Sequence, residues 1–475
     1  MADTAVAGRA TSPSLAGVRV LVVSNERVAA RMAGPAIRAL QLARQLAARG
    51  AAVTLAAPEL PEIEMGDDDQ ARASEPRLER AAFGTPSARS FRALADAHDV
   101  VVCQPQRMDV LRGLAKSRAR LVFDLYVPSF VERIAQLATE PGDERVRRQL
   151  LERDRLEYAH AVAIGDAFVC ASERQRDHWL GALGQAGRLD LELPVRDPDA
   201  RSLLDVVAFG VDAPPTPLAA AGEGAVRGRL VPDDAVVLLW TGGLWNWLDP
   251  VLVVEALAAA RETEPRLHLV VMGFKHPEEH WQEQEASRRM RERAGELGLL
   301  DSGAVVLCDE WVPYAERGRF LLDADTAVSA HHEGLETRLS YRTRLLDHLW
   351  AGLPSIVTSG DDLARELDAA GAAISVAPGD VAGWVEAMRR IASDPDLREQ
   401  MSTAAATLAK QHRWERTSEP LARIVAEQAA RVASPARRDA SLAARLRYAW
   451  LLVRVRVRTK GLGSLGAAVR GARSR

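Results

Sequence analysis

The sequence predicts an α/β protein with two Rossmann-like, doubly wound domains that face each other across a cleft. Short aliphatic runs alternate with segments whose apolar residues recur at helical spacing, which predicts parallel sheets covered by helices. Glycine-containing or polar loops follow several of these runs, where parallel sheets bind ligands. A proline-rich segment divides the alternation into two parts of similar length, and 475 residues suffice for two domains.

The first predicted domain covers residues 17–211, after a segment 1–16 that we expect to be disordered. Strands at 18–24 and 52–56 flank a helix that begins after a glycine loop and stops at Gly50, which predicts a right-handed β-α-β unit. The same alternation predicts strands at 100–103, 121–125, 167–171 and 204–207 and helices at 131–160 and 174–183.

Residues 212–224 are rich in proline, alanine and glycine and are predicted to be a linker. The second domain, 225–430, repeats the alternation and ends in closing helices, and a basic tail, 431–475, follows it. Its predicted strands are 236–240, 267–272, 305–307, 326–328, 355–358 and 373–376, and its predicted helices are 250–261, 341–351 and 381–391.

Composition excludes several classes of protein. The hydrophobic share of 47% and the charged share of 27% are ordinary for a soluble globular protein and exclude collagen-like and disordered chains. A net charge of −3 argues against a nucleic-acid-binding protein. Cys103, Cys170 and Cys308 form no Cys-x-x-Cys motif, so we expect buried free thiols in a cytoplasmic protein and no metal cluster. Neither a signal peptide nor a transmembrane helix is expected.

Two glycine loops are candidate phosphate sites. Gly34 lies between the first strand and its helix, where backbone amides attract anions, although an ordinary turn glycine is the alternative. Gly242 and Gly243 directly follow a strand and are close to Trp245 and Trp247. These tryptophans can wall a base or sugar site, or pack between the domains. Neither loop matches a dinucleotide-binding or P-loop motif.

The strongest candidate site lies between residues 330 and 354. Arg338, Arg342 and Arg344 cluster at the predicted start of a helix, with Ser340 as its expected N-cap, which suits a diphosphate. Asp347 follows one to two turns later, where it can accept hydrogen bonds from ribose hydroxyls. The alternative is a solvated charged face of the helix.

Four segments together resemble glycosyltransferase family 4, whose members have the GT-B fold. Residues 350–357 resemble the end of the family's donor-binding helix and the strand after it. Residues 34–50 resemble its N-terminal glycine loop and helix, and 171–176 and 209–212 resemble two further landmarks. The resemblance covers about residues 18–430 and implies transfer of a sugar from a nucleoside-diphosphate sugar, with retention and without a bound metal or other cofactor.

The resemblance also implies roles for particular residues. Asp347 falls on the family's ribose-binding glutamate, while the position of its first glutamate holds Leu339. Glu333 and Glu336 lie nearby, and Glu336 is expected to bind the donor in its place. Gly243 and Leu248 replace a basic pair of the second glycine loop, so the three arginines are expected to supply that charge.

Asp124 matches the aspartate of a His-Asp pair in which Phe123 replaces histidine. The resemblance implies that Asp124 orients or deprotonates the acceptor hydroxyl, whereas capping of the following turn is its alternative role. Two other functions remain open at this point: a sugar-nucleotide epimerase of the same fold, and a non-catalytic nucleotide-sugar-binding protein.

The tail, 431–475, holds twelve basic residues and one acidic residue. Its apolar residues fall on one helical face, flanked by arginines; they are Leu442, Leu446, Ala449, Trp450, Val453 and Val457. Such a helix is typical of binding to an anionic membrane surface, which would suit a saccharide or lipid-linked saccharide as acceptor. Docking on the acidic body of the protein, or disorder, is the alternative.

Overall fold

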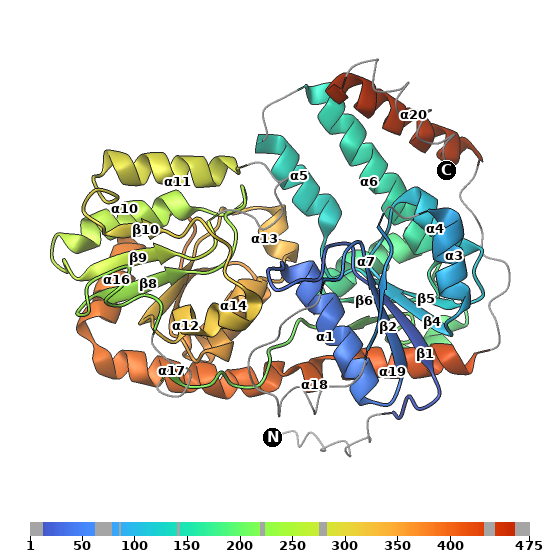
Figure 1. Cartoon of the computed structure of the whole chain (residues 1–475), viewed down its shortest axis with the longest axis horizontal. Helices are drawn as coiled ribbons and strands as arrows, with labels where there is room; N and C mark the ends of the chain where they lie inside the picture. Colours follow the sequence, from blue (N-terminus) through green and yellow to red (C-terminus); the bar gives the residue numbers. More distant parts are fainter. Residues whose placement is uncertain are drawn as a thin grey trace.

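The structure, a computed structural model, describes residues 13–61, 78–84, 87–139, 143–218, 224–274, 283–431 and 442–460. Two α/β domains lie side by side, and the helices after the second sheet run along one edge of both (Figure 1). The predicted pair of doubly wound domains is confirmed.

The N-terminal domain is built on seven parallel strands in the order β3-β2-β1-β4-β5-β6-β7. These strands are β1 (Arg19–Val23), β2 (Ala52–Ala57), β3 (Glu79–Ala82), β4 (Val100–Cys103), β5 (Arg120–Asp124), β6 (Ala167–Cys170) and β7 (Leu204–Val206). The central strands are continuous aliphatic runs because helices bury both faces of the sheet.

Helices cover both faces of this sheet. One face packs against α1 and the C-terminal α19, and the other packs against α3, α4, α6 and α7. The helices of this domain are α1 (Gly34–Ala48), α3 (Ala88–Asp96), α4 (Met108–Ala115), α5 (Ser129–Thr139), α6 (Glu144–Ile164), α7 (Glu173–Gln185) and α8 (Leu193–Arg196).

The C-terminal domain is built on six parallel strands in the order β10-β9-β8-β11-β12-β13. These strands are β8 (Val236–Trp240), β9 (Leu267–Val271), β10 (Val305–Leu307), β11 (Thr326–Ser329), β12 (Ser355–Thr358) and β13 (Ala373–Val376). Its helices are α10 (Pro250–Arg261), α11 (Glu285–Glu296), α12 (Arg317–Leu321), α13 (Leu335–Leu339), α14 (Thr343–Trp350), α15 (Asp362–Ala369) and α16 (Val381–Ser393). Four more helices follow or pass out of this domain: α17 (Pro395–Ala409), α18 (Trp414–Thr417), α19 (Glu419–Ala430) and α20 (Leu442–Lys460).

In each sheet the strand order reverses at one place, between β1 and β4 and between β8 and β11. At such a point the connections on the two sides go to opposite faces of the sheet, and a crevice opens at the carboxyl ends of the strands. The two crevices therefore define where a ligand can reach both domains.

The helix predicted at 341–351 differs from the structure. Ser340 follows the short helix α13, and α14 begins only at Thr343. The Ser340 hydroxyl is buried and has no hydrogen-bond partner in the described part of the chain, and Arg342 precedes α14 in its place, so the expected N-cap is wrong. Leu15 is fully buried beside α1, so the predicted disorder of 1–16 fails at this residue, while residues 1–12 lie outside the described part of the chain.

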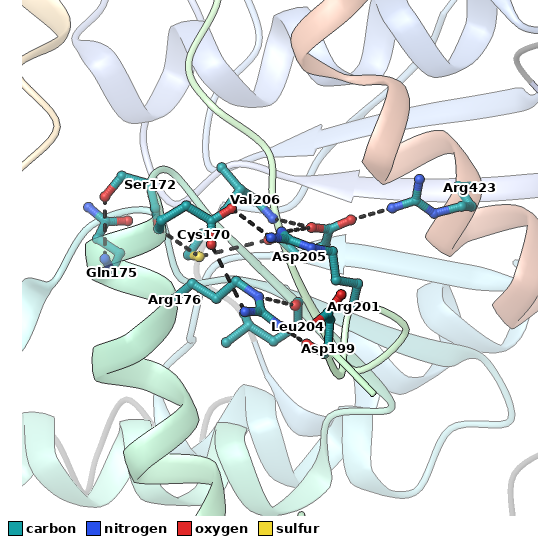
Figure 2. Close-up of polar contacts among 11 residues, drawn as sticks. Cys170, Ser172, Gln175, Arg176, Asp199, Arg201, Leu204, Asp205, Val206 and Arg423 are labelled. Carbon is teal, nitrogen blue, oxygen red and sulfur yellow. Dashed lines mark hydrogen bonds and ion pairs between the residues drawn. The ribbon is translucent and has the colours of Figure 1, made fainter. Parts of the chain in front are cut away.

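The closing helices pack on the N-terminal domain, although the sequence assigned them to the second. The backbone of Val211 exchanges hydrogen bonds with His412 (2.7 Å) and Trp414 (3.2 Å), and the Trp414 indole packs on Phe209. Beyond this point Arg423 of α19 pairs with Asp205 of β7, which also pairs with Arg201 at 2.7 Å (Figure 2). The chain thereby closes the N-terminal sheet with its own C-terminal helices.

Cys103 and Cys170 are buried free thiols, as predicted, whereas Cys308 is partly exposed. Burial raises the pKa of both buried thiols. Cys170 lies next to β7, and its thiol donates a weak hydrogen bond to the carbonyl of Asp205 (Figure 2). These positions indicate packing roles for Cys103 and Cys170.

At Gly210 the backbone passes very close to Trp414. A Cβ there would lie 2.7 Å from Cδ2 of Trp414 and 2.9 Å from its Cα, so backbone must move. We expect Gly210→Ala to lower the free energy of unfolding by about 1–3 kcal/mol, the usual cost of overpacking. Gly181→Ala, on an exposed turn of α7 with nothing within 4 Å, is the matched control and should be neutral or stabilising. Urea unfolding of both variants measures this, and equal stabilities would contradict the packing argument.

Candidate active site

A cleft of about 530 Å³ lies between the domains at the two crevices. The loops after β1 and β4 and the first turns of α1 and α5 line it from the N-terminal domain. The loops after β8 and β9 and the first half of α14 line it from the other domain. Its size is that of an ordinary small-ligand site.

Two helices begin at the cleft without a side-chain cap. Ala33 precedes α1 and Arg342 precedes α14, and neither side chain accepts a hydrogen bond from the first turn. Gly34 and Thr343 line the cleft, and a Cβ on Gly34 would lie 3.8 Å from the Thr343 hydroxyl. Free amides and the positive ends of two helix dipoles therefore converge on one place, which favours an anion.

Arg344 adds a positive charge to the same region. Its Nη2 donates to the carbonyl of Gly243 at 2.8 Å, while its Nη1 is buried with no hydrogen-bond partner among the described residues. Burial, aided by the nearby Arg342, lowers the pKa of Arg344 to about 9. A bound anion such as a diphosphate would accept a hydrogen bond from this N–H and would favour the charged form of Arg344.

The other two predicted arginines do not join it. Arg342 is buried in an ion pair with Glu336, whose oxygens it meets at 3.1 and 2.7 Å. Arg338 is exposed on α13. The side chains of Arg338, Arg342 and Glu336 do not line the cleft. The expectation of one arginine cluster holding a diphosphate is thus corrected: the break between α13 and α14 separates the three arginines, and of these only Arg344 lines the cleft.

The glycine loop after β8 is open to the cleft. Gly242 has φ +72°, and a Cβ there would meet nothing within 4 Å, so the space beside it is free for a ligand. Trp245 and Trp247 stack with ring centroids 5.5 Å apart, and both line the cleft with Trp311. Of the two alternatives left open by the sequence, the structure favours an aromatic wall on the C-terminal side.

Asp347 lines the cleft, as expected of a ligand-binding carboxylate. It accepts a hydrogen bond from Nε of Arg317 at 3.1 Å. Burial raises the pKa of Asp347, and the nearby Arg317 opposes this rise. Arg317 also pairs with Asp212 at 3.0 Å, so the orientation of Asp347 depends on the interdomain linker.

Asp124 does not line the cleft. Both of its oxygens accept from Arg38, at 2.6 and 3.0 Å, and both side chains are buried. Arg38 is held further by the Val207 carbonyl at 2.8 Å. A carboxylate so paired has no place for an acceptor hydroxyl, so the geometry argues against the predicted catalytic role and for a structural ion pair.

Glu132 is the cleft residue that the sequence did not reveal. It lies in the first turn of α5 and lines the cleft, and its carboxyl makes no hydrogen bond or ion pair with another described residue. Burial and the charge of Glu336 raise its pKa to about 8, although Arg342 and Arg133 oppose this rise. The available signal was an acidic residue in the first helical turn after a predicted strand, at the carboxyl edge of the sheet.

Comparison with solved structures identifies the fold. Sucrose-phosphate synthase of Thermosynechococcus elongatus covers 86% of this chain and 98% of its own, with a TM-score of 0.57 and 13% identity. The match to Anabaena HepE, in complex with UDP and glucose, covers 86% of this chain and 100% of HepE, also with a TM-score of 0.57 and 13% identity. The lipopolysaccharide glycosyltransferase WaaG covers 86% and 98%, with a TM-score of 0.55 and 15% identity. The chain has the GT-B fold.

One curated relative is similar in sequence. D-inositol 3-phosphate glycosyltransferase of Saccharomonospora viridis is 29% identical over 213 residues, which are 43% of this chain and 46% of that protein. The match therefore spans about half the length of the relative. No protein-family model matches the chain.

The raised pKa of Glu132 gives a stability prediction. Between the ordinary glutamate pKa of 4.5 and about 8, the folded chain binds this proton and the unfolded chain does not, so stability falls as pH rises through that window. Glu132→Gln removes the titration. The variant should match the parent at pH 5 and exceed it at pH 9 by about 1–3 kcal/mol, less than the full shift because the side chain borders the open cleft. Urea unfolding across this range measures the difference, and parallel curves would contradict it.

Proposed function

We propose that this chain, which has the GT-B fold, transfers a sugar from a nucleoside-diphosphate sugar to an acceptor hydroxyl. The observation that carries the proposal is the meeting, at one end of the cleft, of two uncapped helix N-termini and the unpaired Nη1 of Arg344. Further support comes from relatives: one curated relative is a glycosyltransferase, and HepE structures hold UDP or UDP-glucose.

In this reaction the bond between the anomeric carbon and the diphosphate oxygen breaks, and its electron pair stays on the diphosphate. The acceptor oxygen forms the new bond and loses its proton. Arg344, the first amides of α1 and α14 and the open loop at Gly242 and Gly243 would stabilise the departing negative charge. Because these groups supply positive charge themselves, we propose no metal or other cofactor and, by resemblance to the family, retention of configuration.

The acceptor would approach from the N-terminal side. That wall carries polar side chains, among them Asn25, Gln104, Gln136 and Glu132, which suit the many hydroxyls of a saccharide. Because its pKa of about 8 keeps Glu132 largely protonated near neutral pH, its carboxyl would donate a hydrogen bond to an acceptor oxygen, and only its ionised fraction could take the acceptor proton. Asp347 would bind the donor ribose, and the tryptophan wall would contact base or sugar.

The acceptor class we propose is a saccharide or a lipid-linked saccharide, reached from the cytoplasmic side of a membrane. The support is the polar acceptor wall together with the arginine-rich C-terminal helix. No helix among the described residues combines the length and apolarity needed to cross a bilayer.

The donor site is tested through Arg344. A thermal-shift screen of nucleoside diphosphates and their sugars would identify the nucleotide, and calorimetry would give its Kd. Arg344→Ala should weaken that binding by about 1.5–3 kcal/mol, the worth of a charge-assisted hydrogen bond, or roughly 10- to 100-fold. Arg338→Ala, an exposed arginine outside the cleft, is the control and should change Kd less than twofold. No stabilising nucleotide, or an unchanged Kd in Arg344→Ala, would refute the proposal.

Asp347 is tested by kinetics with the donor found in that screen. Asp347→Asn keeps the shape but removes the charge, so the donor KM should rise several-fold while kcat falls less, because a ground-state contact is lost. Asp347→Glu should be milder.

Asp347→Asn also removes one partner of Arg317, so a control must separate folding from binding. Asp212→Asn removes the other partner from outside the cleft wall; because Arg317 orients Asp347, this variant should lower the Tm and raise the donor KM, but less than Asp347→Asn does. A large loss of kcat with donor affinity intact would instead place Asp347 at the chemical step. Turnover of the sugar without any acceptor would favour an epimerase.

A further inference from the structure

The C-terminal helix α20 docks on the N-terminal domain through one of its faces. It lies beside α6 (red beside teal in Figure 1). Tyr448 and Leu451 are 6% and 3% exposed and pack with Met108 and Leu156. The Tyr448 hydroxyl also donates to the Glu157 carboxylate. This docking was one alternative for the tail, and the structure bears it out for residues 442–460.

The docked face is not the apolar stripe that the sequence predicted. Leu446, Trp450 and Val453 of that stripe are 63%, 50% and 46% exposed. At 100° per residue these three positions fall on the side of the helix opposite Tyr448 and Leu451. The helix therefore has two apolar faces, of which the body of the protein covers one.

The two faces of α20 also differ in the contacts that their arginines make. The helix carries six basic residues and no acidic one. Acidic groups of α6 and its N-cap take up two of these charges: Arg447 meets Glu152 at 3.0 Å and Arg458 meets Asp143 at 3.9 Å. Arg454 instead lies over the exposed Trp450 ring, with its guanidinium carbon 4.3 Å from the ring centroid. The uncovered face thus combines aliphatic side chains, an indole and a cation.

We propose that this uncovered face of α20, centred on Leu446, Trp450 and Val453, binds the surface of an anionic lipid bilayer. Aliphatic groups and an indole suit the boundary between acyl chains and headgroups, and an arginine beside them suits lipid phosphates. A narrow apolar stripe bordered by arginines fits a bilayer better than a protein core, in which the cations would lose water.

The docking gives this binding a consequence that a flexible tail would not have. Because Tyr448 and Leu451 fix α20 on the N-terminal domain, the bilayer would hold that domain in one orientation. The inference stands apart from glycosyl transfer, since it uses no residue of the cleft. If both hold, the cleft is kept near membrane-borne acceptors.

The test is vesicle sedimentation of the full chain. We expect the parent protein to pellet with vesicles of 70% phosphatidylcholine and 30% phosphatidylglycerol (roughly the anionic share of many membranes) far more than with phosphatidylcholine alone, and less in 0.5 M salt. The double variant Trp450→Glu/Val453→Glu should bind at least tenfold more weakly. Leu191→Glu replaces another exposed aliphatic side chain (95% exposed), far from α20 in sequence, and should bind as the parent does.

Three readouts separate the possible results. Circular dichroism and Tm should be unchanged in the double variant, because both side chains are already exposed. Equal sedimentation of parent and double variant, or equal loss in Leu191→Glu, would overturn the proposal. A parent that dimerises on gel filtration while the double variant is monomeric would assign the face to a second copy and overturn it too. Nucleotide binding by calorimetry, measured on the same samples, reports on the proposed enzyme function independently.

Discussion

One buried cation, Arg317, joins the interdomain segment to a carboxylate of the cleft. Its guanidinium lies between the rings of Tyr314 and Trp350, at 3.7 and 3.9 Å, and it pairs with both Asp212 and Asp347. Such a charge is stable out of water only when its partners stay in place. Asp212 begins the interdomain segment, so the same interaction sets the position of the linker and the direction of the cleft carboxylate. Movement of the domains and binding at Asp347 are therefore physically coupled.

Around this junction the cleft has a clear division of charge. Its positive groups are backbone amides at two helix ends and three arginines. Arg133 and Arg317 are paired with carboxylates, whereas Nη1 of Arg344 has no hydrogen-bond partner among the described residues. The N-terminal wall of the cleft carries a carboxyl, Glu132, whose raised pKa keeps it largely protonated near neutrality. An anion on one side and a hydroxylated molecule on the other are what this arrangement can bind. Arg38 and Arg342, which do not line the cleft, are held in buried pairs by Asp124 and Glu336.

Apolar packing and charge pairing also hold the C-terminal helices on the outside of the N-terminal domain. Helices α18 and α19 leave the second domain and close the sheet of the first, and α20 then attaches to α6. An acidic body holds a basic helix, yet the apolar stripe of that helix stays uncovered. Docking and surface binding, which the sequence presented as alternatives, are compatible because they use opposite faces.

The sequence by itself determined the alternation of strands and helices, since buried parallel strands must be continuous apolar runs. It also located the glycine loops and Asp347, because ligands bind where such strands end. It did not reveal β3 (Glu79–Ala82), whose largely exposed residues, two charged and two alanine, carry no such signal. Only the tertiary structure decided which charges are free: Asp124 meets an arginine 86 residues away, and the break before Thr343 turns Arg344 alone toward the cleft. Pairing depends on which side chains folding brings within hydrogen-bond distance, and that information lies outside any local pattern of residues.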